Sequence, residues 1–201
     1  MNSKSTIRDI LKKESEAILN IPLENPYEVI IDLIENRVHA NGGKLVCSGM
    51  GKAGQIALNV ATTFSSTGTC SVYLHPSEAQ HGDLGVLRDG DVLLLISNSG
   101  KTREIVELIT LAKNFHPHIP IICITGKLDS PLAEQSDYII HTGDTLEVCP
   151  IGLTPTVSTT VMTVIGDILV VLLMEKIGFT KEQYGKRHWG GYLGEQTRKP
   201  N

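Results

Sequence analysis

Hydrophobic residues recur three and four positions apart near the amino terminus, and then the pattern changes to short continuous apolar runs. The first pattern covers residues 4–19 and 25–40 and is typical of amphipathic helices. The second pattern consists of five strand-length runs, at 44–48, 70–74, 92–97, 119–124 and 137–141. Helix-length segments separate several of these runs, at 52–65, 102–115 and 130–135. Alternation at a spacing of roughly 25 residues predicts βαβ units and a parallel sheet.

Strands of a parallel sheet are buried on both faces, which explains why these runs are continuously apolar. We therefore predict an α/β fold of three layers, in which helices flank a five-stranded parallel sheet. No repeat, low-complexity tract or flexible linker interrupts the pattern, so we predict a single domain over residues 1–201. Helices over 4–40 and 156–177 are expected to cover the sheet, before a glycine-rich tail at 185–194. Functional loops are expected at the carboxyl ends of the strands.

A nearly continuous apolar stretch, residues 161–174, resembles a membrane span at first sight. Asp167 interrupts it, and it is shorter than the roughly 20 apolar residues that a spanning helix requires. We interpret it as a buried helix that also takes part in a subunit contact. The first residues carry charges throughout and have no apolar core, which is not the composition of a signal peptide.

Composition narrows the classes of partner. The net charge is −4, Lys and Arg form no long run, and aromatic residues make up only 4% of the chain, so we expect neither a nucleic-acid nor a membrane surface. The four cysteines are widely spaced without a CxxC pair, which predicts buried, reduced thiols in a cytoplasmic protein. They are Cys47, Cys70, Cys123 and Cys149.

The third apolar run ends in the turn Ser97-Asn98-Ser99-Gly100-Lys101-Thr102, and a helical pattern follows. Three hydroxyls and the free backbone N–H groups of a helix start form a cradle for a phosphate group. The alternative is simple helix capping by Ser99 or Thr102, which stabilises a helix by about 1 kcal/mol. Capping needs one hydroxyl and this turn offers three, so we favour phosphate binding.

The first run is followed by Gly49-Met50-Gly51-Lys52-Ala53-Gly54, which matches the GxGxxG pattern of dinucleotide-binding loops. The match is weak, because the acidic residue expected at the end of the second strand is missing. The alternative is a tight glycine turn into a helix. Lys52 at a helix N-terminus opposes the helix dipole at a cost of about 0.3–1 kcal/mol, which indicates an anionic partner.

Other loops carry titratable residues. His75 and His81 lie six positions apart, beside two carboxylates, in a spacing that matches no standard zinc pattern. They are candidates for metal binding or acid–base chemistry, with ordinary surface histidines as the alternative. Glu104 falls in the first turn of a predicted helix, where a glutamate also complements the dipole. Glu147 follows the fifth run, and His188 lies in the glycine-rich tail beside the only tryptophan.

Together these segments resemble the sugar isomerase (SIS) domain family, and within it the arabinose-5-phosphate isomerases. The matching segments are GMGKAG (49–54), SSTGT (65–69), HPSEAQHGDLG (75–85), SNSGKTREI (97–105), EVCPIGLTPTVSTT (147–160), GD (166–167) and HWGGYLG (188–194). The resemblance implies a flavodoxin-like strand order and a homo-oligomer, a dimer of dimers with sites at subunit contacts. It also implies interconversion of D-ribulose 5-phosphate and D-arabinose 5-phosphate, which supplies Kdo, an eight-carbon acidic sugar of lipopolysaccharide or capsule.

The resemblance also assigns roles to residues of this chain. The catalytic positions fall on Lys52, Glu104, Glu147 and His188. The substrate-binding positions fall on Ser48, Gly68, Thr69, His81, Ser97, Asn98, Ser99 and Thr102. No cofactor is required, although His75 matches a position that can hold a divalent metal such as zinc.

An aldose–ketose isomerase moves a proton between adjacent carbons through an enediolate, so it needs a base and positive charge near the developing oxyanion. We expect Glu147 to be the carbon base and His188 to open the sugar ring or transfer hydroxyl protons. Lys52 would stabilise the enediolate oxygen or the phosphate. Glu104 would orient the hydroxyls and tune Lys52, although the roles of the two glutamates could be exchanged.

Three departures from the family pattern bear on substrate and regulation. Lys101 replaces the glutamate of the usual SxSGE[ST] turn, and Trp189 replaces the proline of the usual HPGG motif. The chain also ends before the pair of nucleotide-sensing CBS modules that many members carry. Feedback by Kdo or CMP-Kdo would then act on the isomerase site itself. Two other functions stay open: an isomerase for another phosphosugar, and a non-catalytic sugar-phosphate sensor.

Overall fold

The computed structural model describes residues 3–197 and contains a sheet of five parallel strands. The strands pair in the order β2-β1-β3-β4-β5, so β1 and β3 are neighbours at the centre. In the register, Leu45 of β1 lies between Ser71 of β2 and Val92 of β3. The strands are β1 (Leu45–Gly49), β2 (Ser71–Tyr73), β3 (Val92–Ile96), β4 (Ile121–Thr125) and β5 (Tyr138–His141). The predicted parallel sheet and its flavodoxin-like order are confirmed.

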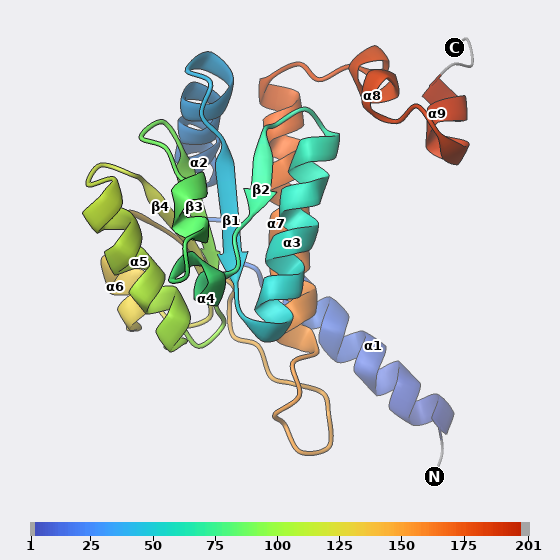
Figure 1. Cartoon of the computed structure of the whole chain (residues 1–201). Coiled ribbons are helices and arrows are strands. Elements are labelled where there is room, and N and C mark those ends of the chain that lie inside the picture. The colour runs from blue at the N-terminus through green and yellow to red at the C-terminus, as the bar shows by residue number, and fades with distance from the viewer. Residues whose placement is uncertain (1–2, 198–201) are drawn as a thin grey trace.

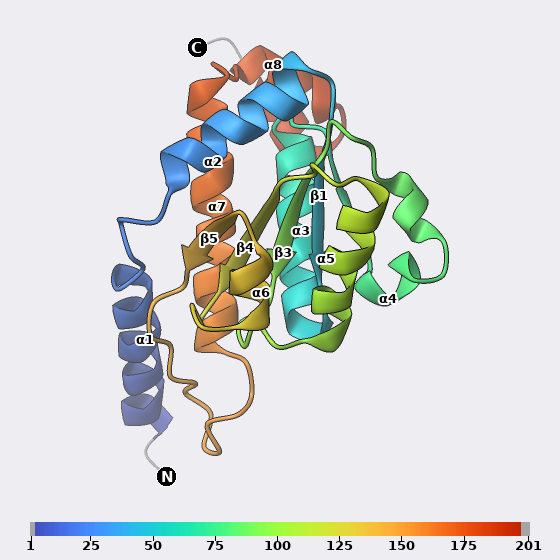
Figure 2. The same cartoon turned by 90° about the vertical axis from the view of Figure 1, so that its left-hand side faces the viewer.

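Helices cover both faces of this sheet and complete the three predicted layers (Figures 1 and 2). One face carries α2 (Tyr27–Ile34), α3 (Gly51–Ser66) and α7 (Val157–Lys176), with α1 (Ser3–Leu19) packed on α7. The other face carries α4 (Pro76–Ala79), α5 (Arg103–Phe115) and α6 (Pro131–Gln135). Successive strand residues alternate between the two cores: Leu45 and Cys47 contribute to the first, and Val46 to the second. This alternation explains why each strand is apolar throughout.

Short helical segments complete the fold. A π-helix (Glu35–Ala40) forms the end of the helix predicted over 25–40, and a 3-10 helix (Asp83–Val86) follows α4. The strand predicted over 119–124 begins only at Ile121, because Pro120 has no N–H to give to the sheet.

The single-domain prediction over residues 1–201 stays a prediction, since residues 1–2 and 198–201 lie outside the described part of the chain.

The stretch 161–174 lies within α7, a helix long and apolar enough to cross a membrane by length and composition. Half of its most apolar window is buried inside the protein. Val161, Ile165 and Leu169 belong to the same core as α2 and α3. The composition of α7 is therefore that of a core helix, as predicted.

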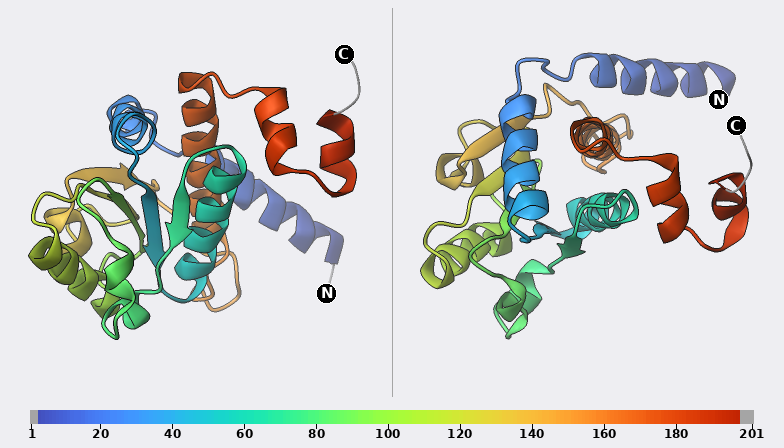
Figure 3. Two further views of the ribbon diagram at one scale, coloured as in Figure 1. Left: turned by 45° about the horizontal axis from the view of Figure 1, so that its top comes forward. Right: turned by 90° about the horizontal axis from the view of Figure 1, so that it is seen from above.

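The glycine-rich tail forms the end of α8 (Lys181–Arg187) and the start of α9 (Gly191–Thr197). Figure 1 shows these helices beyond the carboxyl end of α7, whereas α1 lies beside its amino end. In the view from above, α8 and α9 stand away from the sheet on the side of α3 and α7 (Figure 3). We call residues 178–197 the C-terminal arm.

Two of the four cysteines follow the prediction of burial. Cys47 and Cys123 are buried, and burial raises the pKa of their thiols to about 12 and about 11. Cys149 is half-buried. Cys70 is exposed, because it precedes the edge strand β2 and so lies before the sheet begins. The expectation of burial was wrong for Cys70.

Candidate active site

The chain leaves β1 and β3 in opposite directions, because β2 lies on one side of this pair and β4 on the other. Open parallel sheets bind ligands at such a switch point, beyond the carboxyl ends of the strands. A cavity of about 480 Å³ lies there. Among the described residues, it is lined by six of the predicted site residues, namely Lys52, Ser97, Asn98, Ser99, Thr102 and Glu147.

The turn after β3 has the form expected of a phosphate cradle. Its hydroxyls converge, with Ser97 Oγ and Thr102 Oγ1 3.0 Å apart, and the backbone N–H of Lys101 donates to Ser99 Oγ at 3.3 Å. Gly100 has φ +60°, and a Cβ there would collide with Ser130 Oγ. Thr102 is the N-cap residue of α5 but forms no side-chain cap hydrogen bond. Capping therefore does not explain the hydroxyl of Thr102, and the first N–H groups of α5 lack a side-chain partner at the cap.

Lys52 enters the cavity from the start of α3. Gly51, with φ +59°, turns the chain from β1 into this helix, and Met50 provides no side-chain cap. A Cβ at Gly54 would lie 2.6 Å from the carbonyl oxygen of Gly49, so a glycine is required for close packing of helix and strand. The interpretation as a glycine turn is correct, and it places an exposed lysine beside the phosphate turn.

Glu147 lies in the segment that returns from β5 to α7. Its Oε2 accepts hydrogen bonds from the backbone N and Oγ1 of Thr156, at 2.7 and 2.8 Å. Its Oε1 accepts a hydrogen bond of 2.5 Å from Ser158 Oγ. Partial burial works to raise the pKa of Glu147, but the hydrogen bonds from Ser158 and Thr156 outweigh it and hold the pKa below its ordinary value. Glu147 is thus an ionised, fixed carboxylate at the edge of the cavity.

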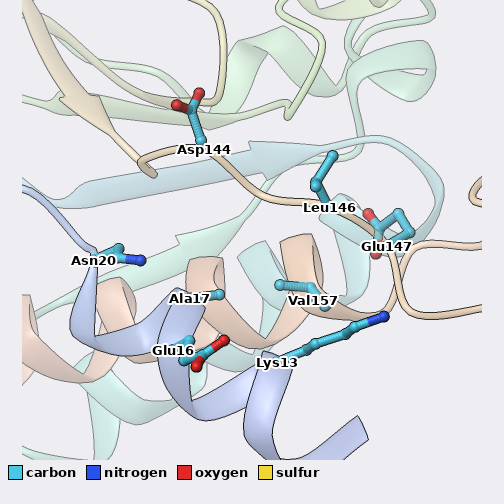
Figure 4. A pocket seen from close by; sticks show the side chains of 8 residues that line it. All are labelled: Lys13, Glu16, Ala17, Asn20, Asp144, Leu146, Glu147 and Val157. Atoms are coloured by element: carbon cyan, nitrogen blue, oxygen red, sulfur yellow. The ribbon is translucent and has the colours of Figure 1, made fainter. Parts of the chain in front are cut away.

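A second cavity of about 320 Å³ lies on the other side of the 144–147 segment, under α1 (Figure 4). Leu146 and Glu147 line both cavities. The side chain of Lys13 extends from α1 toward the Glu147 segment, while Asp144 lies at the far side of this cavity. Both cavities therefore give access to the region around the same glutamate.

Two predicted substrate-binding residues at this edge carry buried polar atoms without a hydrogen-bond partner. Ser48 Oγ, near the end of β1, is one, and Asn98 Oδ1, just beyond β3, is the other. Buried polar atoms are ordinarily satisfied, so these two atoms indicate a place for water or for ligand hydroxyls.

Glu104 and His81 do not line the cavity in this chain. Glu104 lies half-buried in the first turn of α5, two residues beyond the end of the phosphate turn at Thr102. His81 is exposed beyond α4, at the carboxyl end of β2. Both stay at the same edge of the sheet as the cavity, and their roles stay predictions.

His75 was the metal candidate. Its Nδ1 is buried without a hydrogen-bond partner, and its ring lies 6.3 Å from that of Tyr73. Over residues 3–197, no group of three or more His, Cys, Asp or Glu side chains is arranged to hold a metal ion. A zinc site needs about four ligands. His75 alone does not provide such a site within one chain.

His188, Gly68 and Thr69 lie at the opposite end of the sheet from the cavity. α7 begins beside Glu147 and runs for 20 residues, about 30 Å, before the C-terminal arm that carries His188. The His188 ring stacks on Tyr184 at 3.7 Å, and its Nδ1 is 3.0 Å from the carbonyl oxygen of Tyr184. Within one chain, His188 therefore cannot reach Glu147.

Thr69 is only 1% exposed, and its Oγ1 lies 3.1 Å from Nε2 of His39. Phe179 and Arg187 of the C-terminal arm cover Gly68. Burial, opposed by Glu35 and assisted by Arg187, holds the pKa of His39 below its usual value.

Comparison with known proteins identifies the fold family. Residues 40–172 match the SIS domain. This chain belongs to the SIS domain family. Over 154 residues it is 48% identical to the arabinose 5-phosphate isomerase KdsD of Shigella flexneri, a match of 77% of this chain and 46% of that protein. The KdsD of Pseudomonas aeruginosa is 45% identical over 157 residues, which are 78% of this chain and 48% of that protein. The chain spans about half the length of the curated relatives it matches.

Solved structures of SIS proteins superpose closely. A Bacteroides fragilis NCTC 9343 protein, whose name describes a phosphosugar isomerase involved in capsule formation, is 61% identical with a TM-score of 0.93. The match covers 95% of this chain and all of that one. An Escherichia coli CFT073 protein in complex with arabinose 5-phosphate is 36% identical, with a TM-score of 0.82 and coverage of 94% and 100%. The predicted family and fold are confirmed.

The sequence did not identify three side chains around Glu147 in this SIS domain. Thr156 and Ser158 lie in a run of hydroxyl residues at the start of an apolar helix, where they are expected as ordinary helix caps. One signal in the sequence could have found Thr156 and Ser158: Glu147 precedes them by nine and eleven residues, so its carboxylate can fold back onto the start of the helix and replace a side-chain cap. Lys13 lies on the exposed side of α1, and only the fold brings it near the site.

Proposed function

We propose that this chain is an aldose–ketose isomerase that interconverts D-ribulose 5-phosphate and D-arabinose 5-phosphate. One observation carries the proposal: the cavity at the β1–β3 switch point joins the Ser97–Thr102 turn to Lys52 and to the ionised Glu147. The names of the KdsD relatives and the arabinose 5-phosphate complex of the Escherichia coli protein support the choice of substrate.

The turn after β3 holds the phosphate through backbone N–H groups and hydroxyls, which fixes the reacting carbons in place. Glu147 takes the carbon-bound proton and returns it to the neighbouring carbon. Lys52 stabilises the enediolate oxygen or the phosphate as negative charge develops. Between the two glutamates, the cavity favours Glu147 as the base, because Glu104 does not line it.

A second copy of the chain supplies His188. The His188 ring lies at the far end of α7, so a neighbouring protomer has to place it at the cavity, together with the region of Gly68 and Thr69. Exposed apolar side chains on α1, α7 and the C-terminal arm support such contacts. They include Ile7, Leu11, Val171, Trp189 and Tyr192. We propose the dimer of dimers expected for the family, to be measured by light scattering.

The proposed reaction takes place in the cytoplasm and supplies Kdo for lipopolysaccharide or capsule. Kdo or CMP-Kdo would exert feedback at the isomerase site, and the chain binds neither nucleic acid nor membrane. Thermal shift and inhibition by the two sugars test the feedback: absence of both effects would remove it. No metal is required for the reaction, and a divalent ion at His75 would need ligands from outside this chain. Activity after chelation tests this.

The deciding experiment is incubation of the purified chain with D-ribulose 5-phosphate, followed by detection of D-arabinose 5-phosphate. Turnover, together with a loss of about 10²–10⁴-fold in Glu147→Gln, supports the proposal. Faster turnover of a hexose or seven-carbon ketose phosphate would assign another substrate, a result for which Lys101 leaves room. Binding of these sugars without any turnover would make the chain a non-catalytic sensor.

A further inference from the structure

The Glu147 carboxylate takes the place of a side-chain cap at the start of α7. The side chain of Thr156, the N-cap residue, forms no cap hydrogen bond with its own helix. Instead its backbone N–H and its hydroxyl both donate to Glu147 Oε2. The helix dipole adds to this arrangement, because a carboxylate is favoured at a helix N-terminus. The start of a 20-residue core helix therefore fixes the position of the carboxylate.

The two carboxylate oxygens have different surroundings. Thr156, on the Oε2 side, does not line the substrate cavity, whereas Ser158, on the Oε1 side, does. The backbone N of Val148 donates to Thr156 Oγ1 at 3.3 Å, so this hydroxyl directs its own hydrogen to Oε2. Oε2 is thus held by two donors from a residue that does not line the cavity, and Oε1 by one donor from a residue that does.

Ser158 is 1% exposed, and its hydroxyl donates to Oε1 at 2.5 Å. An ionised acceptor makes such a bond roughly twice as strong as a neutral one. A hydroxyl can also rotate and accept a hydrogen bond, which a backbone N–H cannot do. Ser158 can therefore stay bonded to Oε1 both before and after that oxygen takes up a proton.

We propose that Ser158 is a positioning residue that holds Glu147 ionised and presents its Oε1 oxygen to the reacting carbon. This inference rests on the proposed isomerase function. In the proton transfer, the C–H bond of the substrate breaks, its electron pair enters the enediolate, and the proton forms the O–H bond on Oε1. A second transfer gives that proton to the adjacent carbon, while a hydroxyl proton moves from the oxygen of the carbon that becomes the carbonyl to the oxygen of the other carbon. Ser158 keeps its own proton throughout.

The test compares Ser158→Ala with Ser158→Thr, which keeps the hydroxyl. Loss of a hydrogen bond to a charged group is expected to lower kcat by about 10–100-fold, with KM for ribulose 5-phosphate nearly unchanged. The acid limb of the pH–rate profile is expected to move upward by about one pH unit, because a lost donor makes the carboxylate more basic. Ser158→Thr is expected to restore the position of the limb. Thr163→Ala, which removes a hydroxyl bonded only to the carbonyl of Thr159 in the same helix, is the matched control.

A second measurement needs no substrate and so separates this inference from the proposed function. The lowered pKa of Glu147 stabilises the fold above the unfolded pKa of a glutamate, and this stability is lost as pH falls through the folded pKa. Ser158→Ala is expected to reduce the change of the unfolding midpoint with pH. When Glu147 is already replaced by Gln, adding Ser158→Ala should leave the change of the midpoint with pH as it was.

If the wild type shows no isomerase turnover, the proposed function is overturned. If the unfolding measurements on Ser158→Ala, with and without Glu147→Gln, are as expected, the Ser158–Glu147 coupling still stands. The positioning role would be overturned if Ser158→Ala lowered kcat equally at every pH, with no shift in the acid limb and no change in the pH dependence of unfolding.

Discussion

The hydroxyls of Ser97 and Thr102 lie 3.0 Å apart across the turn that joins β3 to α5. If this pair shapes the phosphate site, Thr102→Val should raise KM for the sugar phosphate by about 10-fold, the cost of one hydrogen bond to a charged group. The change in kcat should be smaller, since the backbone N–H groups of the turn still hold the phosphate in place. Steady-state kinetics check this.

Thr62→Val is the control for Thr102→Val, because the Thr62 hydroxyl bonds only to backbone carbonyls of its own exposed helix surface. It should leave KM unchanged. Equal values of KM in Thr102→Val and wild type would mean that backbone N–H groups alone hold the phosphate.

Gly100 combines a positive φ with the absence of space for a Cβ. Gly100→Ala should destabilise the fold by about 1–3 kcal/mol, through backbone strain and the collision with Ser130. Gly42 is the control for backbone strain without a collision. Its φ is +73°, and no atom lies within 4 Å of the point where a Cβ would be. Denaturant unfolding should show a smaller loss in Gly42→Ala. Equal losses would show that the turn moves to accept the methyl group.

Complementation between two inactive variants tests whether His188 acts across a subunit contact. In a mixed dimer of Glu147→Gln and His188→Ala, one of the two sites regains both side chains. Random mixing should restore about a quarter of the wild-type activity. Each variant refolded alone supplies the baseline. Inactive mixtures that have formed mixed dimers would place His188 in the same chain as its Glu147, or remove it from the reaction.

Lys44 and Asp91 form an ion pair of 2.6 Å that is almost fully buried on the aspartate side. Asp91 also accepts hydrogen bonds from the backbone N of Lys44 and of Arg88. Asp91→Ala should therefore cost about 3–5 kcal/mol, because it leaves a buried charge without its partner. The exposed ion pair between Lys12 and Glu16 is the comparison. Glu16→Gln should lower the free energy of unfolding by at most about 0.5 kcal/mol. Unfolding in urea measures both.

Cys149 is the thiol that we expect to react first with an alkylating agent. Its sulfur accepts hydrogen bonds from the backbone N of Thr154 and Leu153, and these donors lower its pKa to about 7. The thiolate is the nucleophile, so the rate should rise with pH and reach half its maximum near pH 7. Cys149→Ser should lose this fast phase. A fast phase that persists in Cys149→Ser would assign it to the exposed Cys70.

The sequence predicted the sheet well because each strand is apolar on both faces. Runs such as 92–97 are typical of strands that are buried on both faces, as in a parallel sheet. Their order was less accessible: it came from the family resemblance, since apolar runs alone do not say that β1 lies next to β3. Only this adjacency makes one site out of Lys52 and the Ser97–Thr102 turn.

The rest of the site depends on distances that a sequence does not contain. Ser158 could not be recognised as a partner of Glu147, because the path of the loop between them, which brings the two side chains to 2.5 Å, cannot be read from the sequence. His188 was expected in the same site as Glu147, with sites at subunit contacts, and the length of α7 separates the two residues within one chain. The contact expected between Thr69 and the substrate stays a prediction, and within one chain Thr69 is buried against His39.

α7 has one end at the Glu147 carboxylate and the other at the C-terminal arm. A single-residue insertion in this helix would rotate everything beyond it by about 100° and lengthen it by about 1.5 Å. The arm would then leave its stacking and covering contacts, and His188 would face a new direction in any assembly. Homologues of this chain should therefore tolerate gaps in the exposed 150–155 loop far more readily than within α7.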